Sequence, residues 1–168
     1  QNTLLTLDDH TDIVFGLAYS HDGSVLASTG ADSTVYLWDA QTGALLTSFE
    51  GHSEYAYNIE FSPDDMLLAT CSWDETARIW DVLSGNLLYE LTDHDGVVWD
   101  VAWSPDGSIL ATGSWDDTII LWDTTTGTQV TRLYGHTADV EGFNFSPDGT
   151  QLASSSDDGT VRLWDVST

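Results

Sequence analysis

Lysine is absent from the sequence, and its only basic residues are the three arginines Arg78, Arg132 and Arg162. The 28 Asp and Glu residues therefore give the 168-residue chain a formal net charge of −25. Nucleic acids and anionic membrane surfaces bind mainly to Lys and Arg side chains. We therefore expect neither a nucleic acid nor a membrane as a partner, whereas a charge of this sign favours basic partners.

Long apolar segments are also lacking. No run approaches the roughly 20 residues of a membrane span, and the start at Gln1 shows no basic-then-apolar signal peptide. We expect Gln1 to mark a processing or engineering boundary, and we favour a cytoplasmic location. Cys71 is the single cysteine, so no disulfide can form within the chain.

Disorder is not indicated, although the chain is acidic. Apolar residues make up 41% of it, and its eight Trp, six Tyr and five Phe exceed what a disordered acidic tail contains. The length is sufficient for one domain, which buries about 70% of the surface of the unfolded chain. We therefore predict a folded chain with a substantial core.

The chain divides into four repeated units. A Trp-Asp pair recurs every 42 residues, at Trp38, Trp80, Trp122 and Trp164. A histidine keeps the same step, and the units that start at this histidine cover residues 10–51, 52–93, 94–135 and 136–168. Repeats of this period are typical of propellers and other repeat architectures. We treat the chain as one repeat array, in which residues 1–9 precede the first complete unit.

Within each unit the apolar residues follow the two-residue period of β-strands. Runs such as Ile119–Trp122 lie between turn signals, and no segment has a helical period. The pairs Asp22-Gly23, Asp106-Gly107 and Asp148-Gly149 are typical hairpin turns, whereas the second unit has Asp64-Asp65 there. Counting the runs gives four short strands per unit, which is the composition of one β-propeller blade.

These features resemble the WD40-repeat β-propeller family over the whole chain. The third unit shows the motif most fully, from His94 through Trp103-Ser104-Pro105-Asp106-Gly107 to Leu121-Trp122-Asp123. Two units have Asp-His where the family motif has Gly-His. The resemblance implies an all-β fold with four blades per chain.

Each unit also contains His, a hydroxyl residue, Asp and Trp at fixed offsets. The four sets are His10, Ser28, Asp32, Trp38; His52, Thr70, Asp74, Trp80; His94, Thr112, Asp116, Trp122; and His136, Ser154, Asp158, Trp164. A Ser-His-Asp hydrolase site is one interpretation. The fourfold occurrence and the free exchange of Ser for Thr argue against it, and the resemblance implies a buried hydrogen-bond network instead. We expect no catalytic residue, no metal site and no cofactor, because no phosphate loop, Cys/His spacing or calcium loop is present.

The resemblance further implies that three positions per unit open onto one end of the propeller, here called the top face. They are the third and fifth residues after the repeated His and the residue before the repeated Asp. In chain order they are Ile13, Phe15, Ala31; Tyr55, Tyr57, Trp73; Val97, Trp99, Trp115; and Asp139, Glu141, Asp157. Three units thus present apolar or aromatic residues and the fourth presents carboxylates.

Such a face predicts a ligand with apolar or aromatic groups and with Arg or Lys, such as an extended peptide. The alternative is that some rings, Phe15 and Trp99 above all, fill contacts between blades. The repeated aromatic residues of the strands, Tyr19, Phe61, Trp103 and Phe145, are predicted to be core. Arg78 and Arg162 share an offset and are predicted to form solvated ion pairs with nearby carboxylates.

Four blades leave the question of ring closure. Residues 3–7 are predicted to be the outermost strand of a blade whose other three strands lie at the end of the chain. We predict a homodimer that closes an eight-bladed ring, with this strand exchanged at both junctions between chains. The alternatives are a four-bladed ring made by one chain and a fragment of a longer propeller.

Three functions therefore compete. The favoured one is a non-catalytic protein- or peptide-binding scaffold that uses the top face. The second is a self-assembling repeat scaffold, natural, designed or excised, that has no ligand. The third is a carbohydrate-binding or glycosidase-like propeller, since Trp platforms beside the carboxylates of Asp139, Glu141 and Asp157 also suit sugars.

Overall fold

The computed structural model describes residues 3–167, which form four antiparallel β-sheets and, within this range, no helix. The first sheet contains β1 (Val14–Tyr19), β2 (Val25–Gly30), β3 (Thr34–Asp39) and β4 (Leu45–Glu50). The second contains β5 (Ala56–Phe61), β6 (Leu67–Ser72), β7 (Ala77–Asp81) and β8 (Leu87–Leu91). The third contains β9 (Val98–Trp103), β10 (Ile109–Ser114), β11 (Ile119–Asp123) and β12 (Thr128–Leu133). The last has three strands, β13 (Val140–Phe145), β14 (Gln151–Ser156) and β15 (Val161–Asp165).

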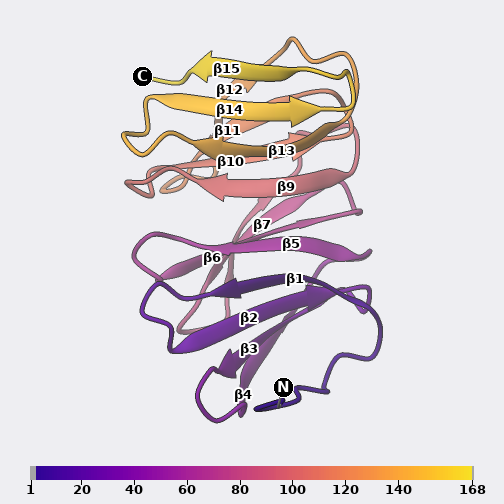
Figure 1. Ribbon diagram of the computed structural model, residues 1–168, viewed down its shortest axis with the longest axis vertical. Helices are drawn as coiled ribbons and strands as arrows, with labels where there is room; N and C mark the ends of the chain where they lie inside the picture. Colours follow the sequence, from indigo (N-terminus) through magenta and orange to yellow (C-terminus); the bar gives the residue numbers. More distant parts are fainter. Residues whose placement is uncertain (1–2, 168) are drawn as a thin grey trace.

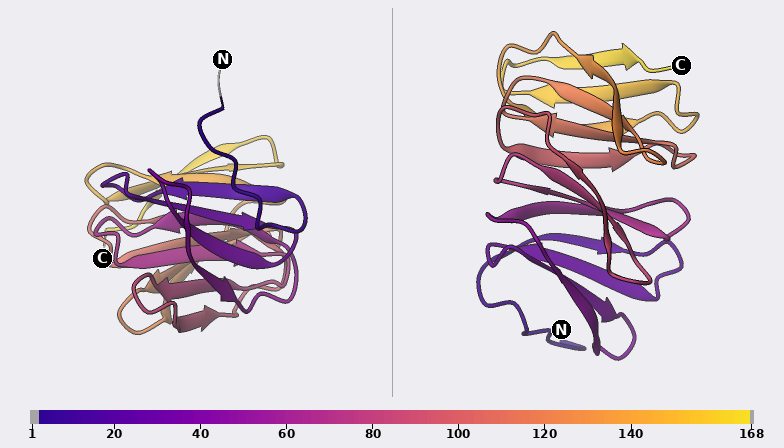
Figure 2. Two further views of the ribbon diagram at one scale, coloured as in Figure 1. Left: turned by 90° about the horizontal axis from the view of Figure 1, so that it is seen from below. Right: turned by 180° about the vertical axis from the view of Figure 1, so that it is seen from behind.

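The sheets follow one another along the molecule in chain order, as Figure 1 shows. Contacts between sheets join β1 to β5, β5 to β9 and β9 to β13. The first and last sheets lie at opposite ends of the stack in both side-on views (Figures 1 and 2). The described chain is therefore an open series of blades, and the alternative of a four-bladed ring made by one chain is not what the structure shows.

The turns between the first two strands of each sheet explain the recurring Ser-x-Asp-Gly pattern. Ser104 donates its hydroxyl hydrogen to Asp106, and the same oxygen accepts the N–H of Ile109. Gly107 follows with φ of 74°, which glycine adopts without steric cost. In the second unit Asp65 takes this left-handed conformation, with φ of 60°. The second unit therefore has Asp in place of Gly at this position and still forms the same turn.

The hydrophobic core lies between consecutive sheets rather than within one sheet. Between the first two sheets, Val35, Leu37 and Phe49 pack against Ile59 and Phe61. A second core joins the second and third sheets, and a third joins the third and fourth. Cys71 is fully buried in the second of these cores. The second and third sheets are therefore each packed between two neighbours, whereas the first and last sheets have one neighbour each.

The missing neighbours expose positions that are buried elsewhere. Leu17 of β1 is 64% exposed, whereas its repeat equivalent Ile59 is 3% exposed. On the opposite end, Leu163 of β15 is 70% exposed, whereas its equivalent Leu37 is 2% exposed. Tyr19, which we predicted to be core, is also 64% exposed, because no sheet covers this side of β1. The prediction was correct for the equivalent Phe61 and Trp103, which are buried between sheets, and Phe145 is half-buried.

The N-terminal segment does not form the predicted strand in this single chain. Residues 3–9 belong to no strand, and residues 1–2 of the predicted segment 1–9 lie outside the described range. Leu5 and Leu7 lie against Gly43 in the turn that connects β3 with β4. The three-stranded sheet that this segment was expected to complete is at the other end of the molecule. Within one chain the segment therefore cannot reach the free edge of β15.

The arginines correct a second prediction. Arg78 is a buried residue that pairs with Glu90 of β8 and lies over the Trp80 ring, so its ion pair is not the solvated one expected. Arg162 lies over the Trp164 ring in the same way but pairs with no carboxylate in residues 3–167. The difference arises because the strand that supplies Glu90 to Arg78 has no counterpart beside β15.

Candidate binding face

The repeated His, hydroxyl, Asp and Trp residues form one hydrogen-bonded chain in every unit. In the third unit, Trp122 Nε1 donates to Thr112 Oγ1 over 2.8 Å, and His94 Nε2 lies 2.8 Å from the same oxygen. His94 Nδ1 lies 2.8 Å from Asp116. The imidazole therefore donates from Nδ1 to the carboxylate and accepts the Thr112 hydroxyl hydrogen at Nε2. The other three units have the same connections.

Burial determines what these networks can do. The hydroxyl residues Ser28, Thr70, Thr112 and Ser154 are all buried, so a substrate cannot reach them as nucleophiles. Burial lowers the pKa of His52, so this imidazole is held neutral. The carboxyl of Asp74 is partly buried, which favours the neutral form, but hydrogen bonds from His52 and Thr76 outweigh this and lower its pKa. The hydrolase interpretation of the His, hydroxyl and Asp residues is therefore wrong, because no substrate can reach the hydroxyl. The networks stabilise the sheets instead.

A second repeated contact positions the predicted top-face residues. In the first three units, the backbone N–H of the residue before the repeated Asp donates to the carbonyl of the third residue after the repeated His. These bonds are Ala31 to Ile13, Trp73 to Tyr55 and Trp115 to Val97, and in the fourth unit Asp157 donates to Asp139 in the same way. Two of the three positions of each unit are thus held together by a backbone hydrogen bond, whatever side chains they carry.

Six aromatic residues on this face form what we call the aromatic cluster. They touch in a closed cycle, with centroid distances of 6.0 Å for Phe15–Tyr55, 5.2 Å for Tyr55–Trp73, 5.8 Å for Trp73–Trp115, 5.0 Å for Trp115–Trp99, 3.8 Å for Trp99–Tyr57 and 5.3 Å for Tyr57–Phe15. The cluster therefore joins the first three units into one continuous aromatic surface.

Exposure divides the cluster into an outer and an inner half. Phe15, Tyr55 and Trp73 are 38–39% exposed, whereas Tyr57, Trp99 and Trp115 are half-buried. The inner rings pack between units, as the alternative interpretation expected of some rings, and they contact outer rings that face solvent. Trp99 is an inner ring and Phe15 an outer one. Ile13 is exposed, and Val97 and Ala31 are half-buried.

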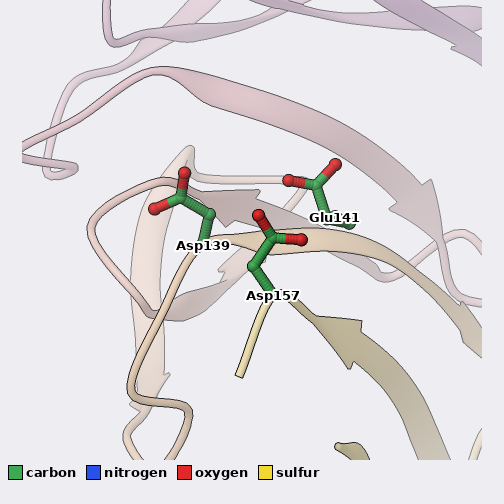
Figure 3. A group of neighbouring side chains, drawn as sticks. All are labelled: Asp139, Glu141 and Asp157. Atoms are coloured by element: carbon green, nitrogen blue, oxygen red, sulfur yellow. The ribbon is translucent and has the colours of Figure 1, made fainter. Parts of the chain in front are cut away.

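The fourth unit contributes the acidic cluster, which consists of Asp139, Glu141 and Asp157. One carboxylate oxygen of each lies within 4.8 Å of the others, and Figure 3 shows the three side chains grouped at one end of β13 and β14. Burial, followed by the charges of Asp157 and Asp139, raises the pKa of Glu141. The Glu141 charge also raises the pKa of Tyr57, after burial of that ring. The acidic cluster follows the aromatic one along the molecule, because β13, which carries Glu141, contacts β9, which carries Trp99. Three such carboxylates attract cations in general, which include basic side chains.

Two half-buried carboxylates were missed by sequence reasoning. Glu60 Oε2 accepts the N–H of Trp103 over 2.9 Å, and burial raises the pKa of Glu60 to about 7. Asp100 accepts the side-chain amide of Asn58 and the N–H of Phe143, and burial raises its pKa as well. Both join neighbouring sheets. The available signal was their occurrence at repeat positions that hold no acid in the other units, such as Ala18 and Ala102 for Glu60.

Comparisons with known proteins agree with this architecture. The family described as WD domain, G-beta repeat matches residues 1–39, 43–81, 85–123 and 127–165. Protein Mut11 of Chlamydomonas reinhardtii is 58% identical over 38 residues, which cover 23% of this chain and 10% of that protein. The chain thus spans about a tenth of the length of this curated relative. The crystal structure of the computationally designed Ika4 protein is similar with a TM-score of 0.89 and 29% identity, over 99% of both chains.

Proposed function

The chain belongs to the WD40 repeat family, and from this membership we propose that it is a non-catalytic scaffold whose top face binds a protein or peptide. The observation that carries the proposal is the closed cycle of six aromatic rings across three units. Contiguous exposed apolar surface is uncommon on proteins that bind nothing, and Trp and Tyr are frequent hot-spot residues.

The adjacent acidic cluster defines the chemistry of the ligand. Apolar or aromatic side chains of a peptide can pack on the outer rings of Phe15, Tyr55 and Trp73. An Arg or Lys side chain can lie over an aromatic ring and pair with Asp139, Glu141 or Asp157. None of the ion pairs within residues 3–167 involves these three acids, so their charge is available to a ligand.

The test is a binding screen with labelled peptides that combine aromatic and basic residues, read by fluorescence polarisation. We expect the double substitution Trp73→Ala and Trp115→Ala to weaken binding at least tenfold, because truncated hot-spot residues cost about 2 kcal/mol or more. Leu83→Ala is the control, since Leu83 is 90% exposed and lies outside the top face. Circular dichroism checks the fold of both variants.

Three outcomes would contradict the proposal. Equal binding by the double variant would place the ligand elsewhere. Binding to a glycan array with none to peptides would favour the carbohydrate alternative. Absence of any ligand, with assembly unchanged in the double variant, would favour a self-assembling scaffold without a ligand.

We also propose that two chains close an eight-bladed ring. The observation that carries it is the apolar surface at both ends of the stack, where Leu17 and Leu163 are exposed although their equivalents are core. The uncovered face of each end sheet is equivalent in the repeat to a face that is buried between sheets inside the chain. An end sheet of a second copy can therefore pack on it as consecutive sheets of one chain pack on each other. Two copies related by twofold symmetry make two identical junctions and leave no open end.

Strand exchange supplies the missing edge in the same arrangement. Residues 3–8 are the repeat equivalents of β4, and Leu7 corresponds to Phe49 and Leu91, which are buried. In the ring this segment would pair with β15 of the second copy and complete its sheet. The unpaired Arg162 lies where this strand would run, as Arg78 lies beside β8.

Light scattering after size exclusion tests ring closure. We expect a mass of twice the 18.4 kDa chain, independent of concentration. Leu163→Asp should reduce the mass to one chain, because it buries a charge in the junction. Leu83→Asp is the matched control at an exposed leucine away from both ends. A wild-type mass of one chain, or a mass that grows steadily with concentration, would contradict the closed ring.

A further inference from the structure

The top-face residues of consecutive units contact one another in a regular progression. The fifth residue after the repeated His is Phe15, then Tyr57, then Trp99, and each ring touches the next, at 5.3 and 3.8 Å. Glu141 is the fourth member of this series. Glu141 lies in the fourth unit, which is the last one that the structure describes.

Ring closure would continue the progression across the junction. The unit that follows the fourth one would be the first unit of the second copy, whose member of the series is Phe15. The relation that brings Tyr57 next to Phe15 within one chain would bring Glu141 of one copy next to Phe15 of the other. Ile13, which is exposed in the single chain, corresponds to Tyr55 and would border the same acidic cluster.

We propose that each binding site is built by two chains and takes a peptide with basic residues on both sides of an apolar or aromatic segment. The inference rests on the proposed function and on the proposed ring. Each aromatic cluster would have its own acidic cluster at the Trp99 end and the acidic cluster of the other copy at the Phe15 end. The ring would carry two aromatic clusters that alternate with two acidic clusters, so that each acidic cluster would border both aromatic clusters.

Charge and distance support this arrangement. The three carboxylates of an acidic cluster repel one another, and a cation on either side relieves that repulsion. Among residues 3–167 no arginine pairs with them, since Arg78 and Arg132 are occupied by Glu90 and Asp116. The two centroid steps of 5.3 and 3.8 Å from Phe15 to Trp99 correspond to about three residues of extended peptide. Basic residues roughly three to five positions apart therefore match the two borders.

Synthetic peptides test the inference directly. The probes are fluorescein-labelled peptides with a Leu-Trp-Leu centre that carry Arg at both ends, at one end or at neither. We expect the wild-type protein to bind the doubly basic peptide at least tenfold more tightly than either singly basic one. The monomeric variant Leu163→Asp should lose this preference while it still binds singly basic peptide, because it retains only its own acidic cluster.

Mixed rings supply a second, independent measurement. One chain carries Trp73→Ala and Trp115→Ala, and the other carries Asp139→Asn, Glu141→Gln and Asp157→Asn. The mixed ring retains one intact aromatic cluster, and its only acidic border comes from the other chain. We expect it to bind singly basic peptide several-fold more tightly than either variant alone.

The outcomes distinguish a failure of the two-chain site from a failure of the proposed top-face binding. If no probe binds the wild-type ring, the proposed function fails. If the wild type binds doubly and singly basic peptides equally, if the monomeric variant keeps the preference, or if the mixed ring shows no gain, top-face binding stands and the two-chain site is wrong.

Discussion

At the scale of single residues, the repeat separates scaffold from candidate site. The repeated histidines, which occur in all units, belong to hydrogen-bond networks, in which His52, His94 and His136 are buried and His10 is half-buried. Positions that differ between units, such as Trp99 and Glu141, lie on the top face. The network needs the hydroxyl of this residue but not the methyl group of threonine, since Ser28 and Ser154 stand where the other units have Thr70 and Thr112.

This requirement gives a prediction at Thr112. Thr112→Val removes the acceptor of the Trp122 N–H and the donor to His94 Nε2, so two buried polar groups lose their partner. We expect unfolding free energy to fall by about 2–4 kcal/mol, measured by urea denaturation. Thr112→Ser is the matched control and should cost much less. A loss as large for Ser as for Val would show that packing of the methyl group, and not the hydrogen bonds, matters at this position.

At the scale of strands and sheets, the sequence predicted most of the architecture. The two-residue period and the Asp-Gly turns located the strands from β1 onward, because alternate side chains of a strand point to the same core: Ala69 and Cys71 of β6 lie in one core, and Leu68 lies in the other. The outcome at residues 3–7 could not be read from the pattern, since Leu5 and Leu7 are as apolar as their equivalents in paired strands. Such a segment forms a strand only if the edge of a sheet is available to pair with it, and the sequence of the segment itself does not show this.

The junction between β5 and β9 carries a pH-dependent contact. The pKa of Glu60 is raised from 4.5 to about 7 by burial, with a smaller contribution from Asp100 that His21 opposes. Below pH 4.5 this carboxyl is protonated in both the folded and the unfolded chain. As the pH rises from there to 7, the unfolded chain releases the proton first, so the contribution of Glu60 to stability falls over this interval.

Glu60→Gln should remove this dependence, because glutamine keeps a neutral acceptor for the Trp103 N–H. We expect the variant to be more stable than the wild type by about 1–3 kcal/mol at pH 8 and by little at pH 4. Urea denaturation at both pH values measures the difference, with the exposed Glu54→Gln as control. A stability difference that is the same at pH 4 and pH 8 would show that burial does not hold the proton on Glu60.

At the scale of the whole molecule, the sequence predicted four blades per chain and an open half-ring, with a closed four-bladed ring as an alternative. The repeat fixes each contact between neighbouring sheets, and therefore the open succession in Figure 1. The candidate top face came from the resemblance to the WD40 family, and the backbone bonds that hold residues such as Trp73 and Trp115 recur in all four units. The closed cycle of rings could not be predicted, since it depends on how large side chains such as Trp99 and Tyr57 share the space between units.

The buried Cys71 has a consequence for the ends and the middle of the stack. Its thiol is enclosed in the core between the second and third sheets, and burial raises its pKa well above the usual value. Separation of two chains at the ends of the stack would leave this thiol covered, whereas parting of the central sheets would uncover it. The rate of alkylation of this single thiol therefore reports opening between the central sheets, and not separation at the ends of the stack.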